Sequence, residues 1–145
     1  MKVFSIFDLR FAIEQMNENE LKTRMKAFAL RILRLVRALP KTPEGRAIAG
    51  QLVRSGMSVG ANYRSACRAR SKAEFVSRLG IVEEEADECT YWLELLVEGG
   101  IMEARLLEPL LKEANEIVAI VAASRMSAAG RESKIANRKS KMERG

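Results

Sequence analysis

Four stretches of the chain place apolar residues at alternating steps of three and four, and this periodicity constrains the fold more than any other feature. Such a pattern puts all of these side chains on one side of an α-helix, which has about 3.6 residues per turn. The stretches cover residues 21–39, about 43–67, 72–98 and about 103–127. Their apolar stripes are Leu21, Met25, Phe28, Ile32, Leu35 and Leu39; Ile48, Leu52, Val59, Tyr63 and Ala66; Phe75, Leu79, Val82, Ala86, Cys89, Leu93 and Leu96; and Leu107, Leu110, Ala114, Ile117 and Val121.

Short connections with helix-ending and helix-starting residues separate these stretches. Pro40 ends the first, and Thr42 followed by proline is typical of an N-cap and first helical turn. Ser71–Glu74 form a capping box, and Gly99 with the next glycine ends the third helix. Connections this short force neighbouring helices to run antiparallel. The sequence therefore predicts an all-α protein, an antiparallel up-down-up-down four-helix bundle over residues 21–127.

The two ends of the chain lack this periodicity. We expect residues 1–20 to form a poorly specified arm and residues 128–145, which are basic and polar, to form a disordered tail. The longest apolar run, Ile117–Ala123, is far shorter than the ~20 residues of a membrane-spanning helix. The N-terminus is a poor signal peptide. A cytoplasmic protein without a membrane partner is expected.

Residue types needed for catalysis or metal binding are scarce. The chain has no histidine, the commonest general base and a common zinc ligand. The acid-rich third stretch lacks the Glu-x-x-His motif of carboxylate di-metal bundles, and neither a phosphate-binding loop nor a nucleophile motif is present. Cys67 and Cys89 lie outside any CxxC pattern and are expected to be free thiols. We therefore expect no enzymatic activity, cofactor or metal.

Charge is segregated along the chain. Residues 21–40 carry six basic side chains and no acid, residues 41–70 carry six basic side chains and one acid, and the third stretch is mostly acidic. Arginine's planar fork suits bidentate phosphate contacts, and the formal net charge of +6 favours an anionic partner. Ion pairing between basic and acidic helices, within or between subunits, is the alternative. The candidate nucleic-acid-binding residues are Arg24, Arg31, Arg34, Arg46, Arg54, Arg64, Arg68 and Arg70.

Several large apolar residues lie off the four stripes. Left in solvent, they would form an exposed apolar patch, which a second copy of the chain would cover. The alternative is that Trp92 only widens the core of a monomer. The candidate oligomer-interface residues are Leu30, Leu33, Ile81, Tyr91, Trp92 and Leu95.

Three segments carry a resemblance to a known family: Arg54–Arg64 (RSGMSVGANYR), Ser71–Phe75 (SKAEF) and Glu85–Leu96 (EADECTYWLELL). Together they resemble the four-helix-bundle family of 23S rRNA-intervening-sequence proteins, which includes the accessory variability determinant of diversity-generating retroelements. The resemblance spans about residues 18–127. It implies a small bacterial bundle that assembles as a homopentameric barrel with a basic surface. Members from retroelements bind nucleic acid and a reverse transcriptase, and they are not enzymes.

By position, Arg54 and Arg64 match the basic residues of the family motif, and Tyr91, Trp92 and Leu95 match its aromatic segment. The pattern departs mildly from the family where Met57 and Cys89 replace the usual threonine. We therefore expect a homo-oligomeric scaffold that binds RNA or DNA phosphates without sequence specificity, as an accessory to a reverse transcriptase or in association with rRNA. A protein-binding adaptor without a nucleic-acid role is the alternative, and a membrane-surface role for residues 22–39 is a weaker one.

Overall fold

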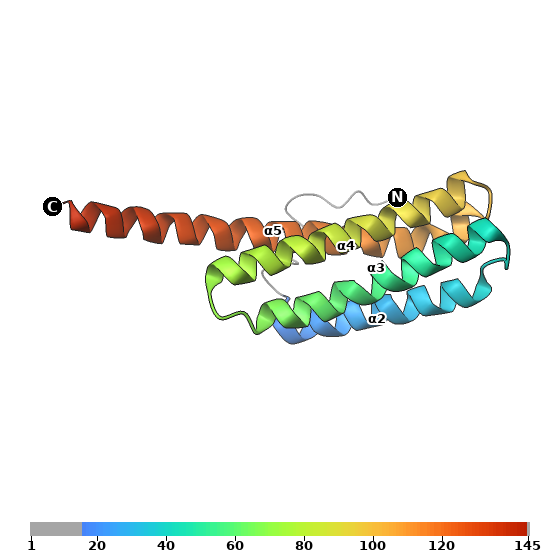
Figure 1. Ribbon diagram of the computed structural model, residues 1–145, viewed down its shortest axis with the longest axis horizontal. Coiled ribbons are helices and arrows are strands. Elements are labelled where there is room, and N and C mark those ends of the chain that lie inside the picture. The colour runs from blue at the N-terminus through green and yellow to red at the C-terminus, as the bar shows by residue number, and fades with distance from the viewer. Residues whose placement is uncertain (1–15, 145) are drawn as a thin grey trace.

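The computed structural model describes residues 16–144, apart from the side chains of residues 131–133. This part of the chain contains four α-helices and no strand: α2 (Glu18–Ala38), α3 (Pro43–Cys67), α4 (Lys72–Glu98) and α5 (Ala104–Glu143). The helices lie side by side along one long axis, joined by short turns (Figure 1). Each helix packs against the next along the chain, and α2 also contacts α5. The predicted four-helix architecture is confirmed.

Side-chain caps explain where the first three helices begin. The Thr42 hydroxyl accepts a hydrogen bond from the Gly45 N–H at 3.1 Å, and the Ser71 hydroxyl accepts one from the Glu74 N–H at 3.1 Å. The Glu74 carboxylate, however, accepts the N–H of Arg70 at 2.8 Å, one residue before the position that a capping box predicts. Each cap satisfies a backbone donor that the first helical turn leaves without a partner.

The helix α2 begins earlier than the apolar stripe indicated. Asn17 accepts a hydrogen bond from the Glu20 N–H at 2.9 Å, and the Glu20 carboxylate accepts the Asn17 N–H at 3.3 Å, which makes a complete capping box. Residues 18–20 therefore belong to the helix, whereas the sequence analysis placed them in the arm. The remaining arm, residues 1–15, lies outside the described residues.

The four predicted stripes form a single core. All of their residues are buried except Leu35 and Phe75, which are half-buried and pack against the core. The largest fully buried side chains come from all four helices: Phe28, Met25, Ile32, Leu52, Leu79, Leu93, Leu96, Leu107, Ile117, Val59, Val82 and Val121. Burial of these apolar side chains is the main force that holds the helices together.

The helix α5 continues to Glu143, so residues 128–143 are helical in the structure, whereas the sequence analysis expected a disordered tail from residue 128. The physical reason is that alanine, lysine, arginine, glutamate and methionine have high helix propensity, and adding residues to a helix avoids the cost of nucleation. This extension projects beyond the other helices, at the end where α3 connects to α4 (Figure 1). We call residues 128–143 the α5 extension.

Candidate nucleic-acid interface

Three of the predicted arginines share the solvent side of α3. Arg46, Arg64 and Arg68 are exposed, and none of them forms a salt bridge within the described part of the chain. At about 100° per residue, the three positions fall within roughly 40° of one another around the helix. Their side chains therefore form one row of free cations along α3.

Two basic residues of α2 that were not among the predicted nucleic-acid-binding residues border this row. The two helices approach closely at the glycines of α3: a Cβ added to Gly56 would lie 3.0 Å from Ile32, and one added to Gly60 would lie 3.4 Å from Met25. Lys26 and Arg37 are exposed on the flank of α2 that faces α3, and neither forms a salt bridge among the described residues. We call Lys26, Arg37, Arg46, Arg64 and Arg68 the basic α2–α3 face.

The middle of this face is apolar. Leu30 of α2 is 47% exposed and Met57 of α3 is 50% exposed. The antiparallel register places them between the basic residues at the two ends of the helix pair. Of the two predicted interface residues on α2, Leu30 is thus a surface residue, and Leu33 is half-buried.

Arg54 lies on the other flank of α3, where it pairs with α4. Its guanidinium contacts the Glu85 carboxylate at 3.1 Å and also the Glu88 carboxylate. The hydrogen bond from Arg54 lowers the pKa of Glu88, and the same bond raises the pKa of Arg54. The alternative interpretation, ion pairing with the acidic helix, therefore applies to Arg54.

Arg24 is also paired within the chain. Its guanidinium bridges α2 to α5, at 2.5 Å from the Glu113 carboxylate and in contact with Glu116 as well. The hydrogen bond to Glu113 is the largest cause of the raised Arg24 pKa. Arg31 lies two turns along the same flank of α2 and is half-buried.

The two remaining predicted arginines are exposed but lie apart from the row on α3. Arg34 lies on the outer side of α2, about 60° around the helix from both Arg31 and Arg37, and Arg70 lies in the turn before α4. The structure thus brings together three of the eight predicted arginines. The helical period identified the seven arginines of α2 and α3 as lying off the core stripe, but it did not show which neighbouring helix each one faces.

The predicted interface residues of α4 lie on its flank toward α3 and on its outer side. Ile81 is 43% exposed and Tyr91 is 54% exposed, whereas Trp92 and Leu95 are half-buried against the core. The Tyr91 and Trp92 rings meet edge to face, with centroids 5.0 Å apart. The Trp92 indole N–H donates to the Glu88 carboxylate at 3.1 Å, which joins the aromatic pair to Arg54.

The two cysteines occupy different environments. Cys89 is fully buried between α3 and α4, where its thiol donates to the Ser55 hydroxyl at 3.2 Å and burial raises its pKa to about 11. Cys67 is half-buried at the end of α3, and its pKa is also raised by burial. Both are free thiols, as predicted. Within the residues that the structure describes, there is no group of three or more metal-ligating side chains.

No helix in residues 16–144 combines the length and the apolar character that a bilayer crossing requires.

Comparisons with known proteins agree with this architecture. A search of curated proteins gave no match. A crystal structure from Bacteroides thetaiotaomicron, described as a protein with unknown function from the S23 ribosomal protein family, is 33% identical, with a TM-score of 0.71. The match covers 77% of this chain and 99% of that chain. The family model described as 23S rRNA-intervening sequence protein matches residues 17–123, which include α2, α3, α4 and the bundle part of α5. The chain therefore belongs to the family of 23S rRNA-intervening sequence proteins.

Proposed function

We propose that the protein is a non-catalytic, homo-oligomeric scaffold that holds the phosphate backbone of RNA or DNA on the basic α2–α3 face. One observation carries this proposal: the five basic side chains of the face are exposed and have no carboxylate partner within the described residues, whereas Arg24 and Arg54 are neutralised by glutamates. Cations that have no carboxylate partner in the fold remain available to a polyanion, whose phosphates pair with them and release counterions.

The dimensions of the face suit a nucleic-acid backbone. Arg46 and Arg68 are 22 positions apart on one helix, which corresponds to about 33 Å at 1.5 Å per residue. A duplex carries one phosphate charge per roughly 1.7 Å of axis, so several phosphates fall within reach. The face contains no aromatic side chain for base stacking, which favours backbone contacts without sequence specificity.

Self-association is the second part of the proposal. Ile81 and Tyr91 are large and exposed on α4, and Tyr91 contacts Trp92, which is the composition of a subunit interface. The family resemblance implies a homopentamer, and a ring of subunits would present several basic faces to one polyanion, which raises avidity. The family's description names the 23S rRNA intervening sequence, and association with rRNA is part of the proposal; the resemblance also allows a reverse transcriptase as a partner.

Charge reversal on α3 tests the binding site. The variant Arg46→Glu, Arg64→Glu, Arg68→Glu is compared with a control that makes the same change of net charge elsewhere, Lys72→Glu, Arg105→Glu, Lys112→Glu. Fluorescence anisotropy with a labelled RNA and a labelled DNA, over a series of salt concentrations, gives the slope of log Kobs against log salt. We expect the slope of the α3 variant to fall by about 2, because each lost phosphate contact removes about 0.7–0.9.

The control variant should keep most of the wild-type slope. Light scattering coupled to size exclusion shows whether both variants keep the wild-type subunit number, which separates loss of binding from loss of assembly. Equal binding by the α3 variant and the wild type would contradict the assignment of this face.

A protein-binding adaptor is the second candidate function. The observation that favours it is the acidic outer side of α4, where Glu84, Asp87, Glu94 and Glu98 are exposed and have no salt bridge among the described residues. An adaptor predicts a pulldown partner that survives nuclease treatment, together with no salt-dependent affinity for nucleic acid. The reverse result supports the scaffold.

A further inference from the structure

The α5 extension carries the core stripe of α5 beyond the end of the bundle. Val121, Ala128, Ile135 and Met142 follow one another at intervals of seven residues, so they lie along one side of the helix. Val121 is buried and Ala128 half-buried, whereas Ile135 is 47% exposed and Met142 84% exposed. The stripe of the extension therefore has one apolar residue per heptad, a narrow apolar line rather than the paired a and d positions of a coiled coil.

The flanks of this stripe are basic. The described side chains from residue 134 onward include five basic residues and one acid, Glu143. Two extensions that paired with each other would therefore bring like charges together, which disfavours a coiled coil between them. The five basic residues, all of them exposed, are Lys134, Arg138, Lys139, Lys141 and Arg144.

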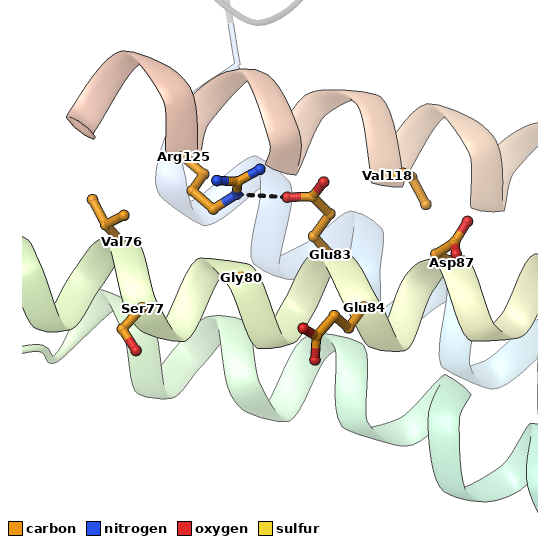
Figure 2. A pocket seen from close by; sticks show the side chains of 8 residues that line it. All are labelled: Val76, Ser77, Gly80, Glu83, Glu84, Asp87, Val118 and Arg125. Carbon is orange, nitrogen blue, oxygen red and sulfur yellow. Dashed lines mark hydrogen bonds and ion pairs between the residues drawn. The ribbon is translucent and has the colours of Figure 1, made fainter. Parts of the chain in front are cut away.

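A groove of opposite charge lies between α4 and α5 of the bundle. It has a volume of about 640 Å³, and Figure 2 shows its lining side chains. Val76 and Val118 supply apolar surface, and Gly80 leaves space because it has no side chain. Glu84 and Asp87 are exposed there and form no salt bridge within the described part of the chain.

Glu83 differs from these two acids because it is already neutralised. The Arg125 guanidinium donates to its carboxylate at 2.7 Å (Figure 2), and this hydrogen bond raises the pKa of Arg125. The groove therefore presents apolar surface beside two unpaired carboxylates, the complement of an apolar stripe flanked by cations.

We propose that the α5 extension of one copy docks into the α4–α5 groove of a second copy. Ile135 packs against Val118, which lies beside Asp87 in the groove (Figure 2), and Arg138 and Lys139 face the carboxylates of Glu84 and Asp87. The extension is long enough to span the groove, because residues 128–143 cover about 24 Å and residues 76–87 of α4 cover about 17 Å. The extension cannot reach its own groove, since it continues α5 straight away from the bundle (Figure 1).

This inference rests on the self-association in the proposed function, but it does not require nucleic-acid binding. The contact is the same whether two copies exchange extensions or each copy extends to the next one in a ring. The family match ends at residue 123, so this contact would be a property of the present chain rather than of the matched region.

Photo-crosslinking in the full chain tests the docking. The nuclease-treated protein carries p-benzoylphenylalanine in place of Ile135, and equal amounts of ¹⁴N- and ¹⁵N-labelled protein are mixed, irradiated and digested. We expect mass spectrometry to find a peptide with residue 135 of one isotope joined to the peptide of residues 76–87 of the other. Crosslinks between two extensions, crosslinks within one copy only, or an oligomer without crosslinks would overturn the proposal.

Charge exchange supplies a second, independent measurement. Glu84→Lys with Asp87→Lys should reduce the crosslink yield about tenfold, because the lysines repel the basic extension. Adding Arg138→Glu and Lys139→Glu to that variant should restore the yield. The matched control, Glu94→Lys with Glu98→Lys, changes the net charge equally on the same helix outside the groove and should keep the wild-type yield.

Light scattering separates the two proposals. A monomer at all concentrations overturns self-association and this docking together. An oligomer whose crosslinks map elsewhere, or whose yield is insensitive to both charge variants, overturns the docking alone. If position 135 crosslinks to added RNA, and the nuclease-treated protein gives no crosslink to residues 76–87, the extension is a nucleic-acid contact and the docking is wrong.

Discussion

The helix α2 is held on its two flanks by different kinds of interaction. On the side of α3 the backbones approach closely, because Gly56 and Gly60 have no Cβ to separate the helices. On the side of α5 the helices touch much less, and Arg24 bridges the gap to Glu113 and Glu116. We call the contact between α2 and α3 the close seam and the contact between α2 and α5 the open seam. The close seam depends on the shape of the two helices, and the open seam depends on the Arg24 cation.

This difference shows which basic side chains of α2 have no partner within the described part of the chain and are free to bind a ligand. Where shape holds two helices together, no charge is needed between them, so the basic side chains of α2 and α3 remain free on the surface. Where α2 and α5 stand apart, Arg24 pairs with Glu113 and Glu116 and is not free for an external ligand. The availability of a cation for an external ligand is thus decided by whether the neighbouring helix carries facing carboxylates. Residues 21–70 contain a single acid, whereas Arg54 and Arg125 pair with glutamates of α4 although α4 packs closely against both α3 and α5.

The largest expected effect comes from filling the close seam. Gly56→Leu forces a side chain into a position where even a Cβ would lie 3.0 Å from Cγ1 and Cγ2 of Ile32, a fully buried residue. We expect a loss of about 3 kcal/mol in the free energy of unfolding, since overpacking a close helix contact moves backbone as well as side chains. Urea unfolding followed by circular dichroism measures it.

Gly50→Leu is the matched control on the same helix. Gly50 is exposed, and a Cβ there would meet nothing within 4 Å. Because leucine has a higher helix propensity than glycine, this variant should gain up to about 0.8 kcal/mol. Equal losses in both variants would mean that the seam is not closed by the glycine contact.

The second expected effect comes from removing the bridge of the open seam. Arg24→Met leaves the Glu113 and Glu116 carboxylates, whose side chains are 19% and 20% exposed, without their cation. We expect a loss of about 2 kcal/mol, because a partly buried charge without a partner keeps its desolvation cost. Replacing both glutamates by glutamine in the same variant should recover most of this loss.

Arg34→Met provides the reference for the loss of one arginine from α2. Arg34 is exposed and forms no salt bridge within the described residues, so its removal should change the free energy of unfolding by less than about 0.5 kcal/mol. A loss in Arg24→Met no larger than this would show that Arg24 does not hold α2 to α5.

The sequence was sufficient for the core, because the information that sets it is local. A stripe residue such as Ile32 or Leu93 is identified by its spacing alone, and both are fully buried. The start of α2 was missed because the capping box at Asn17 lies outside the apolar stripe. The helical state of residues 128–143 was missed because their charge and polarity were weighed above their helix propensity.

The candidate site was predictable only in part. Arg54 and Arg64 lie within about 80° of each other on α3, so periodicity treats them alike. Only Arg54 meets carboxylates, because it lies on the flank that packs against α4. Which flank faces which helix depends on the handedness of the bundle, which no local pattern encodes. Lys26 was passed over for the same reason, since its proximity to α3 is a property of the packed pair.

The smallest expected effect concerns an ion pair within α2, near the start of the helix. The Glu18 carboxylate lies 2.7 Å from the Lys22 ammonium, and this hydrogen bond lowers the pKa of Glu18 from its ordinary value of 4.5. A lowered folded pKa means that the carboxylate stabilises the fold above pH 4.5, and that this stabilisation is lost as the pH falls through the folded value. Glu18→Gln should therefore cost about 0.5 kcal/mol at neutral pH and nothing at the acid end.

Urea unfolding of the wild type and of Glu18→Gln over a pH series checks this, with Lys22→Met as the control that removes the same pair from the other side. The two single variants should lose similar amounts, and the double variant little more than either, because they share one interaction. A pH-dependent loss as large as that of Arg24→Met would contradict the prediction, because an exposed i, i+4 pair within one helix contributes only a few tenths of a kcal/mol.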